Sequence, residues 1–184
     1  MNIIIIFKHK QNNILLYNMS YTNEQLLTST LILKPNDLKN DIDNVIKMKL
    51  KENIEGRCYE DGYIIKDSLR VIQRSMGNIV TNNKKSEIKY KIKYKADIIS
   101  PSVNDEINII INSINKLGVI GYIKIKESDT FEDSPLIIMV PKEYFVGSTL
   151  NYEDILVGQK IDVITVGTRT KYNTKNIQVI AKPV

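Results

Sequence analysis

Basic and aromatic side chains recur together in the second half of the chain, and these residue types suit contact with a nucleic acid. They gather near positions 120 and 170, as Lys116, Tyr122, Lys124, Lys126, Arg169, Lys171 and Tyr172. Cations bind phosphates, and an exposed aromatic ring can stack on a base. The set predicts RNA binding that is weak, sensitive to salt and nearly independent of base sequence. The alternative is that Tyr122 belongs to a core and that the lysines are simply solvated.

Side chains that could support catalysis or bind a metal are few. Cys58 is the only cysteine and His9 the only histidine, so neither a disulfide nor a His/Cys metal site is expected. Arg57 precedes Cys58 and could activate a thiol, but a small buried packing residue is the favoured interpretation. Three acidic residues between positions 129 and 133 indicate a solvated loop, because no histidine accompanies them. The sequence predicts no catalytic site, no metal and no cofactor.

Composition is that of a folded protein with a mild basic bias. The chain has 184 residues, 42% of them apolar, a net charge of +5 and a pI of about 9.1. This length allows two small domains, and the charge favours an acidic or nucleic-acid partner. The frequent Ile, Asn and Lys have AT-rich codons, which suggests an AT-rich source such as a large DNA virus. The apolar run Ile3–Phe7 is too short to span a bilayer, so no membrane association is expected.

The first half reads as a strand, a helix and a hairpin. Ser29–Leu33 is rich in β-formers and ends before Pro35, after which Asn36 or Asp37 can cap a helix. The helical apolar face would consist of Leu38, Ile42, Val45, Ile46 and Leu50. Gly56 suggests a bulge or a close backbone approach, and Asp61-Gly62 predicts a turn between two strands.

Residues 87–99 show the clearest strand pattern in the chain. Ile88, Tyr90, Ile92 and Tyr94 alternate with Lys89, Lys91, Lys93 and Lys95. This period of two predicts a strand with one apolar and one basic face. Two interpretations stay open. The lysines either protect a solvated edge strand from aggregation or form a strip that faces phosphates.

After Ser100-Pro101 the chain reads as almost entirely β. Five strands are predicted over 105–114, 119–126, 136–140, 160–166 and 176–181, with a short turn or helix beginning near 140. Five short strands in about 80 residues suit a small barrel. The predicted fold class is α+β, with a helix packed on an antiparallel sheet followed by an OB-type (S1-like) β-barrel. The predicted domains are an extension over 1–28, a tip domain over 29–99 and the barrel over 100–184.

Four elements resemble one known family in order and spacing. Thr30–Ile65 carries Leu-Lys-Pro, then Glu-Gly-Arg-Cys at 55–58 and Asp-Gly-Tyr-Ile at 61–64; further elements are Tyr90–Ala96, Asp105–Val119 and Ile164–Arg169. Together they resemble the stalk subunits of multisubunit DNA-dependent RNA polymerases, such as subunit seven of eukaryotic RNA polymerase II and the archaeal E subunit. Residues 1–28 have no counterpart in this pattern. The segment after Met76-Gly77 lacks the Gly- and Pro-rich tip loop usual in the family.

The resemblance implies a non-catalytic subunit. Its tip domain would dock on the polymerase core near the clamp, and its barrel would lie beside the RNA exit path and contact nascent RNA. A smaller helical subunit would complete the stalk. The docking residues carried over by the resemblance are Gly56, Arg57, Cys58, Asp61, Gly62 and Tyr63. Hairpin formation alone is the alternative role for them.

Two other functions remain open from the sequence. A free-standing S1/OB-type protein acting in translation or RNA decay would bind RNA without a polymerase. A structural module would use its barrel to bind protein only. A viral subunit is expected in the virion and the host cytoplasm, whereas a subunit from a cellular eukaryote is expected in the nucleus.

Overall fold

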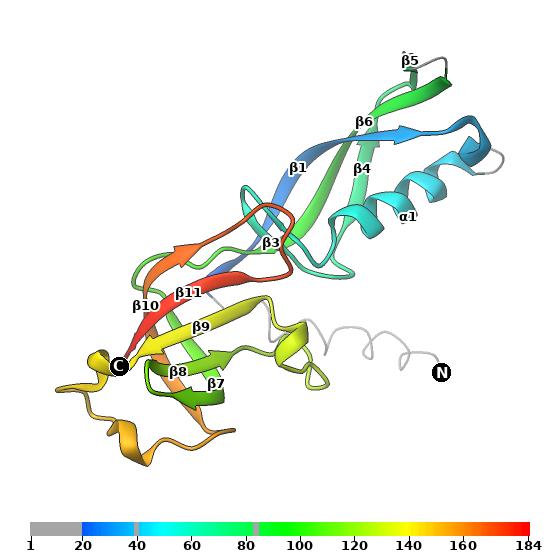
Figure 1. Ribbon diagram of the computed structural model, residues 1–184. Coiled ribbons are helices and arrows are strands. Elements are labelled where there is room, and N and C mark those ends of the chain that lie inside the picture. The colour runs from blue at the N-terminus through cyan, green and yellow to red at the C-terminus, as the bar shows by residue number, and fades with distance from the viewer. Residues whose placement is uncertain (1–19, 39–40, 83–84) are drawn as a thin grey trace, which may run out of the picture. The chain divides into compact units, whose positions relative to one another are not determined.

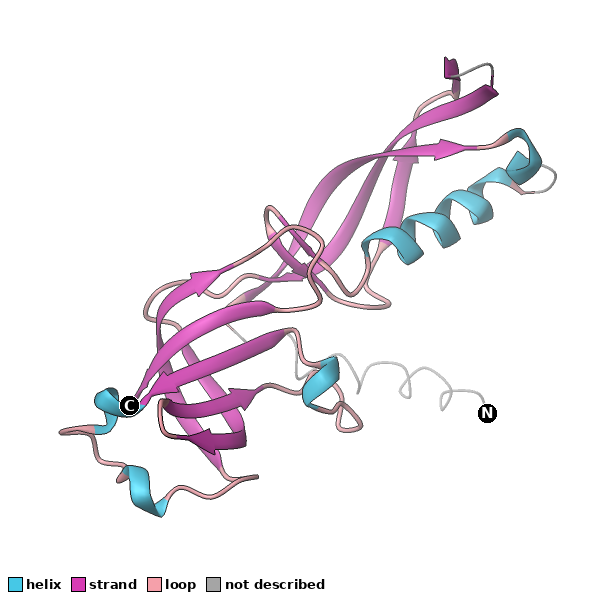
Figure 2. Ribbon diagram, in the orientation of Figure 1, coloured by secondary structure: helices cyan, strands magenta, loops and turns pink. Residues whose placement is uncertain are grey.

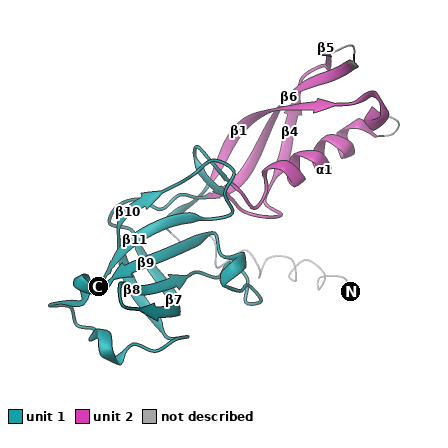
Figure 3. Ribbon diagram, viewed as in Figure 1, with its two compact units in different colours: residues 1–23, 58–63, 99–184 teal, residues 24–57, 64–98 magenta. Residues whose placement is uncertain are grey.

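The computed structural model describes residues 20–38, 41–82 and 85–184, and these residues form two compact units. One unit contains residues 24–57 and 64–98, and the other contains the short segment 58–63 together with 99–184 and residues up to 23 (Figures 1 and 3). The hairpin 58–63 therefore clusters with the C-terminal strands. The domain boundaries predicted at 28/29 and 99/100 stay predictions. No helix among the described residues is long and apolar enough to cross a membrane.

The N-terminal half is a mixed layer of strands and a single long helix within the described residues (Figure 2). Its elements are β1 (Thr22–Leu33), the 3-10 turn η2 (Pro35–Leu38), α1 (Ile42–Ile54), β2 (Cys58–Tyr59), β3 (Gly62–Ile64), β4 (Arg70–Arg74), β5 (Asn78–Asn82) and β6 (Lys85–Ile99). The sheet order is β1-β6-β3-β2, and β4 and β5 also pair with β6. β1 begins at Thr22, earlier than the strand expected from Ser29, and the first 19 residues of the predicted extension lie outside the described residues.

The helix begins one turn later than the sequence predicted. Asp41 is the N-cap, and its carboxylate accepts the backbone N–H groups of Asp43 and Asn44. The cap predicted at Asn36 or Asp37 is wrong, because the Asp37 carboxylate instead accepts the Lys34 N–H and pairs with Lys49 at 2.6 Å. The buried helical residues are Ile46, Leu50 and Ile54. The apolar period was therefore read correctly, but it runs one turn further along the chain.

β6 carries the predicted alternation but is not an edge strand. Tyr90, Ile92 and Tyr94 are buried, whereas Lys89, Lys91 and Lys93 are exposed. The edge-strand interpretation is wrong, because β6 lies between β1 and β3 in the sheet and pairs with β4 and β5 as well. Alternation records which face a side chain occupies; it carries no information on how many strands pair with the backbone.

The face of β6 that carries the buried residues is the face covered by α1. Arg74 on β4 is the cross-strand partner of Ile92, so their side chains share a face. The Arg74 guanidinium pairs with Asp43 on α1 and lies 5.8 Å from the centre of the Tyr90 ring. The helix therefore packs against the apolar face of the sheet, and the lysines point the other way.

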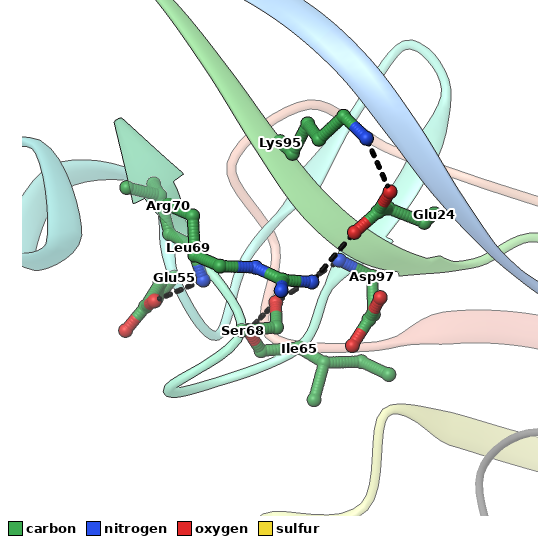
Figure 4. Close-up of polar contacts among 8 residues, drawn as sticks. All are labelled: Glu24, Glu55, Ile65, Ser68, Leu69, Arg70, Lys95 and Asp97. Carbon is green, nitrogen blue, oxygen red and sulfur yellow. Dashed lines mark hydrogen bonds and ion pairs between the residues drawn. The ribbon is translucent and has the colours of Figure 1, made fainter. Parts of the chain in front are cut away.

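A polar network lies around Arg70 (Figure 4). Glu24 on β1 pairs with both Arg70 on β4 and Lys95 on β6, the latter at 2.8 Å. The hydrogen bond from Lys95, with the charges of Lys95 and Arg70, lowers the pKa of Glu24. In the connection to β4, Ser68 donates to the Ile65 carbonyl and accepts the N–H of Asp97. Burial raises the pKa of Asp97.

The C-terminal half is a closed barrel of five strands, as the sequence predicted. The strands are β7 (Glu106–Asn115), β8 (Gly118–Tyr122), β9 (Leu136–Pro141), β10 (Lys160–Arg169) and β11 (Ile177–Pro183), in the closed order β10-β11-β9-β8-β7. The connections carry the short 3-10 turns η3 (Phe131–Asp133), η4 (Lys142–Phe145) and η5 (Tyr152–Asp154). β9 and β11 are parallel, and the other neighbouring pairs are antiparallel. This connectivity is consistent with an OB-type barrel.

Alternating side chains fill the barrel interior. Ile107, Ile109, Ile111, Leu136, Ile138, Val140, Val163, Val179 and Ala181 are almost fully buried. The backbone of β8 approaches its neighbours closely, because a Cβ added at Gly118 would lie 2.2 Å from the Val140 carbonyl oxygen. Glycine is therefore required at the start of β8, where the β7–β8 turn ends.

Candidate nucleic-acid interface

Two connections meet at one end of the barrel. β9 and β11 run in parallel, with Leu136 beside Ile177, so both strands begin at the same end of the barrel. The segments that lead into the two strands therefore lie at that end. The Ile177 N–H donates to the Pro135 carbonyl at 2.8 Å and joins the two segments directly. The β8–β9 connection (residues 123–135) and the β10–β11 connection (residues 170–176) therefore share this end, which we call the loop end of the barrel.

The loop end gathers six of the seven residues predicted to contact RNA. Tyr122, Lys124 and Lys126 lie at or after the end of β8, and Arg169, Lys171 and Tyr172 lie at or after the end of β10. Lys116 does not join them. It occupies the turn between β7 and β8, at the opposite end of β8. Sequence patterns alone do not show which strand ends coincide, so they could not assign Lys116 to one end and the other six residues to the opposite end.

The accessible aromatic surface of the loop end comes mainly from Tyr172. Tyr172 is 72% exposed, and its ring lies nearly perpendicular to the Tyr59 ring at a centroid distance of 5.2 Å. Tyr122 is half-buried and meets Phe131 edge-on at 5.7 Å. Base stacking by Tyr122 stays a prediction, and part of its surface is already covered. Of these two tyrosines, Tyr172 presents the larger surface on which a base can stack.

The cations of the loop end differ in accessibility. Lys126, Arg169 and Lys171 are exposed. Lys124 is half-buried, and its ammonium donates to the Glu127 carbonyl at 3.3 Å. Phosphate binding through Lys124 would have to compete with this bond, and Lys126, Arg169 and Lys171 are the more exposed of the four cations.

The acidic residues of the β8–β9 connection shape the backbone. The Asp129 carboxylate accepts the N–H groups of Ile125 and Lys126 at 3.1 and 2.8 Å. Asp133, the last residue of the turn η3, accepts the N–H and hydroxyl of Thr130, which is the N-cap of that turn. Within residues 20–38, 41–82 and 85–184 there is no cluster of three or more His, Cys, Asp or Glu that could hold a metal ion.

Ser134 joins the two ends of the β8–β9 connection through hydrogen bonds of its buried side chain. Its side chain is buried, and its hydroxyl oxygen accepts the N–H groups of Ile123 and Leu136 at 3.2 and 3.3 Å. The same hydroxyl donates to the Leu136 carbonyl at 2.7 Å. One side chain thus fixes both ends of the segment that carries Lys124 and Lys126.

The β2–β3 hairpin is hydrogen-bonded to the β10–β11 connection. The Cys58 N–H donates to the Thr174 carbonyl, and the Asn173 N–H donates to the Cys58 carbonyl, both at 2.8 Å. A turn joins β2 and β3 as predicted, but it lies at Glu60-Asp61, one residue earlier than Asp61-Gly62. Gly62, with φ +133°, already pairs with Tyr59 in β3. Sequence reasoning assigned the hairpin to docking and the connection to RNA, and it missed these bonds. Nothing in the sequence pattern marks a contact between segments so far apart.

The six predicted docking residues divide into buried and exposed ones. Cys58 and Tyr63 are buried, and burial raises the pKa of the Cys58 thiol. Burial, then the charges of Cys58, Asp129 and Asp133, raises the pKa of Tyr63 to about 12. Tyr63 is only 3% exposed, so its ring is a core group of the loop end.

The remaining docking candidates flank these two. Gly56 does not form the bulge predicted for it. It follows Glu55, the C-cap of α1, with φ +73°, and its N–H donates to the Ile64 carbonyl at 2.8 Å. Arg57 and Asp61 are exposed, so of the six they are the side chains placed for direct contact with a partner.

No family model matches the chain. A protein of Acanthamoeba polyphaga mimivirus, provisionally named DNA-directed RNA polymerase subunit L376, is 26% identical over 167 residues. The aligned region covers 85% of this chain and 78% of the mimivirus protein.

Proposed function

We propose that the chain is a viral, non-catalytic stalk subunit of a DNA-dependent RNA polymerase that docks on the polymerase core near the clamp and contacts nascent RNA. The observation that carries the proposal is the similarity to the mimivirus protein, which extends over most of both chains. That similarity supports membership of a polymerase. The stalk role rests on the family resemblance of the four sequence elements between Thr30 and Arg169.

The barrel supports a role in RNA binding. Five-stranded barrels with this connectivity commonly bind single strands through basic residues and exposed aromatics. The loop end offers the exposed Tyr172 ring together with Lys126, Arg169 and Lys171. Lys124 and Tyr122 contribute less accessible surface, and Lys116 would contact RNA from the opposite end of β8. Binding through so few cations is expected to be weak and sensitive to salt.

Docking is assigned to the β2–β3 hairpin and the residues before it. In this proposal Arg57 and Asp61 contact the core directly, whereas Gly56, Cys58, Gly62 and Tyr63 give the segment its shape. The partners are the polymerase core subunits, a smaller helical stalk subunit and nascent single-stranded RNA. As a viral polymerase subunit it would reside in the virion and the host cytoplasm.

Affinity purification of the tagged protein from infected cells tests the proposal. Recovery of the two largest polymerase subunits in near-equal amounts, identified by mass spectrometry, is the expected result. Asp61→Lys should reduce that recovery at least several-fold. Glu106→Lys makes the same charge change at an exposed position on β7 and should leave recovery unchanged. Purification without the large subunits would overturn the proposal.

A free-standing RNA-binding protein is the second candidate, and the closed barrel is the observation that favours it. It would act in translation or RNA decay. The same purification separates the two functions, because this candidate predicts recovery of ribosomal proteins or decay factors and no polymerase subunits.

A further inference from the structure

We propose a second surface for RNA, formed by Lys89, Lys91, Lys93 and Lys95 on β6 and called here the lysine face. It would bind the phosphates of a single strand independently of the barrel. The lysine face is defined by charge, spacing and strand pairing within the sheet. RNA binding by this face therefore does not depend on whether the chain belongs to a polymerase.

The lysine face is a straight row of cations. Alternate residues of a strand point the same way, so successive lysines are separated by about 6.7 Å along β6. That spacing is comparable with the separation of phosphates in an extended single strand. Lys89, Lys91 and Lys93 are exposed, and the opposite face of the strand is packed against α1. The row is therefore presented by a rigid layer.

The strands beside the row do not neutralise it. The cross-strand partners of Lys89, Lys93 and Lys95 are Asn78, Gln73 and Arg70. None of these partners is acidic, although acidic residues opposite lysines would stabilise a sheet face that only met water. In the described parts of β1, β4, β5 and β6, acidic side chains of this face lie only near the ends of the row.

Those acidic residues leave the centre of the row unpaired. Glu24 pairs with Arg70 and Lys95, as Figure 4 shows, Asp97 lies beyond Lys95, and Glu87 lies beyond Lys89. No ion pair involves Lys89, Lys91 or Lys93 among the residues that the structure describes. Their mutual repulsion is thus left for an external anion to relieve.

The lysine face is also not a defence against edge pairing. Lysines protect exposed sheet edges, but both sides of β6 are paired. Leu26 and Ile32 on β1 occupy the same face as Glu24 by strand alternation and are 62% and 50% exposed. A row of cations beside exposed apolar side chains matches a strand of RNA, whose phosphates and bases lie on different sides of its backbone.

The test measures binding of the full-length protein to fluorescein-labelled oligouridine by fluorescence anisotropy over a range of salt concentrations. The test variant is Lys89→Gln/Lys91→Gln/Lys93→Gln. Loss of three phosphate contacts should reduce the slope of log affinity against log salt by about 2, since each contact with a single strand contributes about 0.7. The corresponding triple Lys→Arg variant keeps the charge and should retain the wild-type slope.

The matched control is Lys34→Gln/Lys47→Gln/Lys66→Gln, which removes the same charge from exposed positions outside the row. Equal slopes for the test and control variants would overturn the proposal, as would a Lys→Arg variant as defective as the Lys→Gln variant. Unchanged RNA binding with loss of an acidic protein partner would also overturn it. None of these results bears on recovery of the large polymerase subunits, so this proposal and the stalk proposal can fail separately.

Discussion

Replacing Ser134 with alanine should destabilise the barrel and loosen the β8–β9 connection. The hydroxyl oxygen is the acceptor for the Ile123 N–H at 3.2 Å and bonds both backbone groups of Leu136. Ser134 is 1% exposed, so water cannot readily replace it. A buried donor left without a partner costs about 1–3 kcal/mol. We expect Ser134→Ala to lower the free energy of unfolding by that amount.

Urea unfolding measures the stability loss, and hydrogen exchange locates it. The Ile123 amide should exchange faster in Ser134→Ala, because its bond to the side chain is lost. Ser128→Ala is the matched control, since Ser128 is exposed in the same connection, and it should change stability by less than about 0.5 kcal/mol. If Ser134→Ala behaves like this control and the Ile123 amide keeps its exchange rate, the assigned role of the hydroxyl is wrong.

Three further predictions concern the N-terminal half. Asp41→Ala removes the N-cap of α1 and should cost about 1 kcal/mol in urea unfolding, whereas Asp41→Asn should cost far less. Gly56→Ala should cost about 1–2 kcal/mol in urea unfolding, because φ is +73° there, whereas the control Gly167→Ala should cost far less, because φ is not positive at Gly167 and an added Cβ would meet no atom within 4 Å. Glu24 has a lowered pKa because of Lys95 and Arg70, so its stabilising contribution is present above the pKa of the unfolded chain and is lost as pH falls through the lower, folded value. Acid titration should therefore show the wild type losing more stability than Glu24→Gln below about pH 4, and parallel curves would exclude this contribution.

Local patterns in the sequence predicted most of the elements. Alternation of buried and more accessible residues marks most of the barrel strands, as in Ile177–Pro183, and turn residues separate the strands. Helical periodicity likewise identified the α1 face that contains Ile46 and Leu50. The helix start was misplaced because Asp37 and Asp41 are both good caps. In the structure Asp41 caps the helix, whereas Asp37 accepts the Lys34 N–H and pairs with Lys49.

Strand pairing was the information that the sequence lacked. The lysine alternation in β6 is the same whether the strand lies at an edge or inside a sheet, so the edge interpretation could not be tested by pattern alone. The grouping of Lys116 with the other predicted RNA-binding residues was wrong for the same reason, namely that strand pairing was not known. Lys116 is close in sequence to Tyr122, but the length of β8 separates the two, and only the parallel pairing of β9 with β11 shows which connections share an end.

The bonds between the hairpin and the β10–β11 connection limit how docking variants can be interpreted. Cys58 exchanges backbone hydrogen bonds with residues 173 and 174, next to Tyr172. A substitution that displaces the buried Cys58 or Tyr63 would therefore also disturb the surface proposed for RNA, and lost polymerase binding would have two explanations. Asp61 avoids this ambiguity, because it is exposed at the turn between β2 and β3. Loss of polymerase binding in Asp61→Lys with unchanged RNA affinity would thus show that the hairpin docks on the polymerase core. A Cys58 variant that lost both polymerase binding and RNA affinity would not distinguish the two roles.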